Sequence, residues 1–227
     1  MFATAPKAEP ASCCAYPPIA AHARTIEEFV PTGWSIEAES RGTLDEDHRD
    51  AISLLLRSTA RAKSDVAPST LPRILAVVER ANDGSYDLVL QNHALIPRLE
   101  NKVARDVDYD LKRGPQILSG VLKVKINRSI MVGSTAEVDQ TFTFRRSNGR
   151  FVLIGYDEGF VTYHQDTGSV SVNYLTNKFS RTVGVNCAGR KDVVKRCKPN
   201  TTWQGLKPAP LLSIDQVGNG FAFHPTL

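Results

Sequence analysis

The sequence predicts a mainly β protein of antiparallel sheets, rich in hairpins and meanders, with only minor short helices. Apolar and polar residues alternate along most segments, which is typical of strands with one buried face. Asn-Gly and Asp-Gly dipeptides separate several of these segments and supply the positive φ angles that tight hairpins need. Because short turns join strands that run in opposite directions, we expect antiparallel pairing throughout.

Composition sets the scale of the fold. The chain has 227 residues, of which 41% are hydrophobic and 23% charged, so it is long enough for one large domain and too apolar for a disordered chain. The net charge of +4 gives no case for binding nucleic acid, and no apolar run is long enough for a transmembrane helix. We expect a flexible lead-in over residues 1–24, one β-rich domain over 25–200, and an irregular segment over 201–227 that packs on the domain or trails it.

In the first half of the chain, Thr25–Glu28 fits a capping box and predicts one helical turn before Phe29. Alternation or short apolar runs then predict a series of strands. These cover residues 34–39, 51–56, 74–78 and 86–90. The turn residues Asn82–Ser85 predict that the last two of them form a hairpin.

In the second half, Leu122–Ile126 alternates apolar residues with lysines and predicts another strand. Thr141–Tyr156 gives the clearest local prediction, a hairpin that turns at Asn148 and Gly149. A further strand is expected over residues 170–174. Residues 99–111 are ambiguous and allow a helix, whereas the proline-rich residues after Cys197 are expected to be irregular.

Basic residues are concentrated near the end of the expected domain. Residues 178–198 contain seven basic residues and one acidic residue, a net charge of +6. Such a segment favours docking of a protein with an acidic surface. The expected contacts are Arg190, Lys191, Lys195 and Arg196. The alternative is a solvated loop with no partner.

The four cysteines suggest a compartment. Cys187 and Cys197 flank a short polar stretch and are expected to form a disulfide, which predicts a periplasmic or secreted protein. Cys13 and Cys14 are neighbours and do not readily pair with each other, so one is open to lipid modification or stays free. No Cys-x-x-Cys pair and no histidine at zinc spacing is present, and a zinc site is not expected.

The acidic stretch 42–50 invites comparison with a calcium loop. Asp45 and Asp47 have the spacing of two ligands, but Thr43, His48 and Ala51 stand where the loop scheme needs an acid, a glycine and a closing acid. The remaining oxygens are too few for Ca²⁺, and the alternative is a polar turn. We therefore expect no metal and no cofactor.

Several motifs resemble a group of exported bacterial proteins that carry a single degenerate repeat similar to the FG-GAP or VCBS type. The matching stretches are Phe29–Trp34, Gly42–Ile52, Phe142–Arg145, Asn148–Tyr156 and Asn173–Asn177. The resemblance implies a β-rich periplasmic or surface protein. It implies no catalytic residue, and the calcium ligands of the repeat are the part that this sequence lacks.

The function expected from these observations is non-enzymatic binding of another protein in the bacterial envelope, with a toxin-neutralising immunity or inhibitor protein as one form. The first alternative is a hydrolase of envelope polymers that uses Glu158, His164 and Asp166 as acid–base groups. The second is a carbohydrate-binding module, for which Trp34 and Trp203 are the only tryptophan platforms. Nucleic-acid binding is not expected, because alternation directs the aromatic residues near 142–160 into a core.

Overall fold

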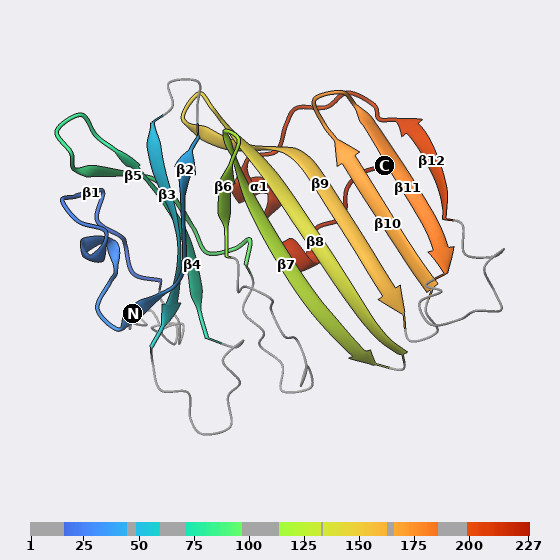
Figure 1. The fold of residues 1–227 in the computed structure, drawn as a ribbon, viewed down its shortest axis with the longest axis horizontal. Coiled ribbons are helices and arrows are strands. Elements are labelled where there is room, and N and C mark those ends of the chain that lie inside the picture. Colours follow the sequence, from blue (N-terminus) through green and yellow to red (C-terminus); the bar gives the residue numbers. More distant parts are fainter. Residues whose placement is uncertain are drawn as a thin grey trace, which may run out of the picture.

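The computed structural model describes residues 16–44, 49–59, 71–96, 114–132, 134–162, 166–185 and 199–227. These residues form two antiparallel sheets with little helix, which confirms the predicted fold class (Figure 1). The ambiguous stretch 99–111 lies outside the described residues.

The first sheet, sheet A, has five strands in the order β1-β5-β4-β3-β2. Their bounds are His22–Ala23 for β1, Trp34–Thr43 for β2, Asp50–Ser58 for β3, Arg73–Arg80 for β4 and Tyr86–Asn92 for β5. The β4–β5 hairpin turns at Asp83 and Gly84 as predicted, and the φ of +87° at Gly84 shows why glycine suits this turn.

The second sheet, sheet B, has seven strands in the order β12-β11-β10-β9-β8-β7-β6. Their bounds are Gln116–Leu118 for β6, Val121–Val132 for β7, Ser134–Ser147 for β8, Arg150–Thr162 for β9, Asp166–Asn173 for β10, Lys178–Val185 for β11 and Asn200–Gly205 for β12. The β8–β9 hairpin turns at Asn148 and Gly149, both at positive φ, which confirms the clearest sequence prediction.

Sheet A is apolar on both faces. Leu55, Leu75 and Val77 face a core shared with sheet B, whereas Leu54 and Leu56 face away from it. The outward face is covered by residues 16–30, whose side chains Ile19, Ala23, Ile26 and Phe29 are buried. Residues 16–24, expected to be a flexible lead-in, instead pack on the sheet, because the fully apolar face of β3 and β4 needs a cover.

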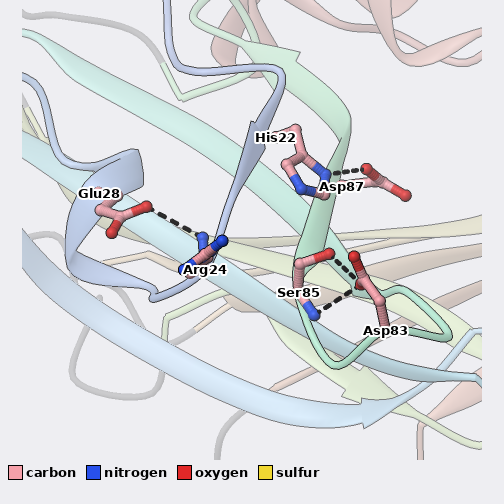
Figure 2. Close-up of polar contacts among 6 residues, drawn as sticks. All are labelled: His22, Arg24, Glu28, Asp83, Ser85 and Asp87. Carbon is pink, nitrogen blue, oxygen red and sulfur yellow. Dashed lines mark hydrogen bonds and ion pairs between the residues drawn. The ribbon is translucent and has the colours of Figure 1, made fainter.

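Polar contacts fix this covering segment along β5 and its turn (Figure 2). His22 Nδ1 lies 2.8 Å from Asp87 Oδ1, next to the short β1–β5 pairing. The backbone N–H of Arg24 donates to Glu28 Oε2 at 2.9 Å, beside the 3₁₀ turn η1 (Glu27–Phe29). The predicted turn is present, but the capping box predicted over Thr25–Glu28 is not, because Ile26 is the N-cap and makes no side-chain cap hydrogen bond. In the adjacent turn, Ser85 donates to Asp83 from its hydroxyl and its backbone N–H, and these bonds lower the pKa of Asp83.

The shared core lies between sheet A and the inner face of sheet B, the face that carries Phe142, Tyr156 and Val172. Phe223 packs edge-on against both Phe142 and Tyr156, with ring centroids 5.6 and 5.1 Å away. The short helix α1 (Ile214–Val217) begins with a capping box of Ser213 and Gln216, and the 3₁₀ turn η5 (Gly220–Ala222) follows it. Figure 1 shows both behind sheet B in dark red.

The C-terminal residues are therefore more ordered than the sequence predicts. Residues 200–205 form a strand, and residues 214–223 pack on the domain and supply part of its core. Gly220 explains how the chain approaches so closely, because a Cβ there would lie 2.6 Å from the carbonyl oxygen of Leu95. Of the four prolines that suggested irregular structure, Pro208 and Pro210 lie between these elements, Pro199 precedes β12 and Pro225 follows η5.

One buried ion pair joins the two sheets. Arg146 at the end of β8 contacts Glu79 at the end of β4, and only 5% of the Glu79 side chain is exposed. Sheet contact continues at β2 and β6, where a Cβ on Gly42 would lie 2.6 Å from the Ile117 carbonyl oxygen. Arg146 therefore links the sheets through its charge. Gly42 allows the backbones of β2 and β6 to approach closely, because any larger side chain would clash with Ile117.

Candidate functional site

The open edge of sheet B is the most exposed regular element that the structure describes. Strand β12 pairs with β11 on one side and has no described strand on the other, and all six of its residues are exposed. Its sequence, Asn-Thr-Thr-Trp-Gln-Gly, contains no charge and no proline. Proteins usually protect such edges with lysine, proline, a bulge or a covering loop. The edge is therefore a ready template for another extended chain.

The direction of the backbone groups on β12 follows from one hydrogen bond. The N–H of Leu206 donates to the carbonyl of Asn177 at 2.7 Å, just beyond the ladder. Because N–H groups alternate in direction along a strand, those of Thr202 and Gln204 face β11. The N–H groups of Thr201 and Trp203 then face outward, where a partner strand would accept them.

Trp203 gives this edge an apolar anchor. Its exposed fraction is 70%, the highest among the large hydrophobic residues of the described part of the chain. It pairs with Ser180 on the outer face of sheet B, opposite to the core. On the same face, the hydroxyls of Thr182 and Thr201 lie 2.9 Å apart. A tryptophan surrounded by hydroxyls suits recognition, since it offers apolar area with hydrogen-bonding groups beside it.

The other edges of the described sheets are less available. Strand β1 is only two residues long, and β6 is three residues long. The β6 edge lies against β2, where the N–H of Ile117 contacts Ser40 Oγ at 3.4 Å. Among the described strands, β12 is therefore the edge with both length and exposure.

The predicted basic contacts Arg190, Lys191, Lys195 and Arg196 lie outside the described residues, as does the predicted Cys187–Cys197 disulfide. The described chain nevertheless locates the two ends of this segment. Strand β11 ends at Val185 and β12 begins at Asn200, and Val183 pairs with Asn200. The segment thus leaves and returns at one end of the β11–β12 pair, beside the open edge. Lys178, which pairs with Gly205, lies at the opposite end of β11.

The other predicted ligand and thiol positions are not described. Asp45, Asp47 and the neighbours Cys13 and Cys14 fall in ranges outside the structure's description. Within the described ranges, no three His, Cys, Asp or Glu side chains gather as a metal site. The absence of calcium and of any cofactor stays a prediction.

The structure describes only part of the group that the hydrolase alternative needs. His164 lies outside the described residues. Glu158 pairs with Val170 across β9 and β10, four residues along β10 from Asp166. At the rise of a strand this offset is about 13 Å between the two backbones. Glu158 also accepts a hydrogen bond from the Tyr156 hydroxyl at 2.6 Å and has a structural partner.

The two tryptophans have different surroundings. Trp34 packs on the cluster beneath the N-terminal segment, with its ring centroid 6.2 Å from that of Tyr16. It therefore offers no free platform, whereas Trp203 does. Sequence analysis considered Trp203 only as a carbohydrate platform and missed β12. The run Thr201-Thr202-Trp203 was the available signal, because β-branched and aromatic residues favour strands.

No protein-family model, curated protein or solved structure matches this chain. The resemblance to proteins with a degenerate FG-GAP or VCBS repeat therefore stays a prediction. In the described portions of the chain, helices are too short to cross a membrane.

Proposed function

We propose that the protein is a non-enzymatic binding protein of the bacterial envelope, and that a partner protein adds an extended segment to the open edge of sheet B. The observation that carries this proposal is β12, a fully exposed, uncharged strand with one free side. Strand addition uses the unpaired backbone groups for affinity and alternate side chains for specificity.

Trp203 is the side chain that anchors the partner. Tryptophan is enriched among the few residues that dominate binding energy, and its loss typically costs 2 kcal/mol or more of binding free energy. Because 70% of the Trp203 surface is exposed, a partner can bury this apolar area when it binds. The outward N–H groups of Thr201 and Trp203 supply the backbone bonds beside it.

The partner's segment is extended and acidic. Five of the seven basic residues of the basic segment 178–198 lie between Val185, where β11 ends, and Asn200, where β12 begins, and these two residues lie at the same end of the sheet. Opposite charge raises the association rate and selects against basic partners. Arg190, Lys191, Lys195 and Arg196 extend this attraction. One form of this function is an immunity or inhibitor protein, which would use the edge to bind and block its target protein.

The envelope location is part of the same proposal. A Cys187–Cys197 disulfide would close the basic segment, and disulfides persist in the periplasm or outside the cell. Alkylation of the freshly purified protein with and without reductant tests it. Mass spectrometry should find this pair protected until reductant is added, and four alkylated cysteines without reductant would contradict the proposal.

Two variants of β12 test the binding mode. Thr201→Pro removes an outward N–H but no bond to β11, and proline is tolerated on the solvent side of an edge strand. Thr201→Val is the matched control that keeps the N–H. Trp203→Ala removes the anchor. Partners captured from the envelope fraction by the full chain are identified, and the affinity of each for the variants is measured.

Strand addition predicts that Thr201→Pro and Trp203→Ala each weaken binding at least tenfold, or about 1.4 kcal/mol, whereas Thr201→Val does not. Changing Arg190, Lys191, Lys195 and Arg196 to Glu should also weaken it tenfold or more. Retention of a polysaccharide that needs Trp203 but tolerates Thr201→Pro would favour a carbohydrate-binding module instead. Equal binding by all variants would remove β12 from the proposal.

A further inference from the structure

The residues that the structure describes cover the inner face of sheet B only in part. The C-terminal residues pack over Phe142 and Tyr156, where Phe223 contacts both rings. Farther along the same strands, the inner face carries Phe160 and Val183, which are 37% and 56% exposed. This uncovered end of the face contains a pocket of about 340 Å³. That volume lies in the range of small-molecule sites.

Strand register defines the floor of the pocket. Glu158, Val170 and Arg181 lie side by side on β9, β10 and β11. The next row along the strands holds Phe160, Gly168 and Val183. Gly168 has no side chain, and the ring of Phe160 occupies the space where its Cβ would stand. The floor is thus apolar, with one carboxylate and one guanidinium on opposite sides of Val170.

The carboxylate of Glu158 is held in place from below. Its Oε2 accepts hydrogen bonds from the Tyr156 hydroxyl at 2.6 Å and from Gln140 Nε2 at 3.3 Å. Gln140 is fully buried and also donates to the Gly220 carbonyl at 3.2 Å. These bonds hold the carboxyl group through Oε2 and leave Oε1 available to a donor from the pocket.

Arg181 supplies the opposite charge. It forms no ion pair with any described residue, although its side chain lines the same pocket as Glu158. Glu158 and Arg181 stand two strands apart, so their backbones are separated by about 10 Å. The two charged groups form no ion pair with each other in the structure, and a small molecule that carries both charges would fit between them.

We propose that this pocket binds a free α-amino acid with a large apolar side chain. Its ammonium donates to Glu158, its carboxylate accepts from Arg181, and its side chain lies on Phe160 and Val183. A simple fatty acid suits the site less, because Glu158 would repel its carboxylate. This site is on the opposite face from Trp203 and is independent of the strand-addition proposal.

Calorimetric titration of the full-length protein with L-phenylalanine tests the assignment. N-acetyl-L-phenylalanine removes the ammonium, and L-phenylalanine amide removes the carboxylate. Glu158→Gln and Arg181→Met remove the protein charges one at a time, while Glu158→Gln keeps an oxygen for Tyr156. Lys178→Met is the matched control, because Lys178 lies on the same strand but on the outer face.

L-phenylalanine should bind, and both blocked forms should bind at least tenfold more weakly. Glu158→Gln and Arg181→Met should each weaken L-phenylalanine tenfold or more, and Lys178→Met should not. Unchanged melting temperatures of the variants establish that they are folded. The proposal would be overturned if L-phenylalanine failed to bind. It would also be overturned if the affinity stayed the same for both blocked ligands and for both variants. Neither result bears on β12, whose test uses other residues.

Discussion

The two sheets differ in what they leave open. Sheet A buries both faces, one under residues 16–30 and one in the shared core, and its edges are short or lie against β6. Sheet B has longer strands, a polar outer face, an uncovered end of its inner face and a free edge at β12. A covered sheet supports stability, whereas exposed backbone and pockets are what recognition needs. We therefore assign stability mainly to sheet A and binding to sheet B.

The largest expected effect comes from the core that both sheets share. Phe142 is fully buried and contacts Tyr156 and Phe223. Phe142→Ala should lower the free energy of unfolding by about 3–5 kcal/mol, because the substitution leaves a cavity. Both sheets should still unfold in one transition in a denaturant titration monitored by circular dichroism and fluorescence. Two separate transitions would show that the sheets are independent units.

The ion pair between the sheets gives the next effect. Arg146→Met leaves the carboxylate of Glu79, 5% exposed, without its cation. Breaking a buried pair from one side costs about 3–5 kcal/mol. The double variant Glu79→Gln with Arg146→Met should recover most of this loss in chemical denaturation. Additive losses in the double variant would mean that the two residues do not act as a pair.

At alkaline pH, Tyr174 should limit stability at the turn between β10 and β11. Burial raises the pKa of Tyr174 to about 12, against 10.0 for a free tyrosine. Between these values the unfolded chain loses the phenolic proton first, so stability falls as pH rises from about 10 to 12. The melting temperature of the Tyr174→Phe variant should fall less steeply with pH across this window than that of the natural chain. Identical pH profiles for both proteins would exclude this role.

The smallest effect on stability is expected at Trp203. Its side chain is 70% exposed, so Trp203→Ala should change the free energy of unfolding by no more than about 0.5 kcal/mol. Binding should nevertheless fall tenfold or more. A large loss of stability would instead mean that Trp203 supports the sheet, and the contrast between a stabilising and a binding sheet would weaken.

Sequence patterns predicted the elements whose cause is local. Alternation and short apolar runs located strands β2 to β5 and β7 to β10, and Asn148-Gly149 located a hairpin, because these signals depend on neighbouring residues alone. Strands β6 and β11 were not predicted. The covering role of Ile19 and Phe29 could not be read this way, since their spacing matches no strand or helix period. Strand β12 was missed because proline-rich composition beyond Cys197 dominated the interpretation.

The candidate sites differ in the same respect. Charge counting pointed to the basic segment, and the described strands place its ends beside β12. The inner pocket needed cross-strand register, because Glu158, Val170 and Arg181 come from three strands and are neighbours only after pairing. Glu158 itself was identified from the sequence, but as an acid–base group together with His164 and Asp166. The pairing of β9 with β10 separates it from Asp166 instead.

The cover over sheet A also matters for solubility. Residues 16–30 shield a face that includes Leu54, Leu56 and Ile74, and β1 contributes only a two-residue ladder to hold them. Detachment of this short segment would expose a continuous apolar sheet surface while the shared core remained intact. Cleavage near residue 30 should therefore produce a protein that keeps its fold but aggregates. The N-terminal segment acts as a built-in guard against self-association.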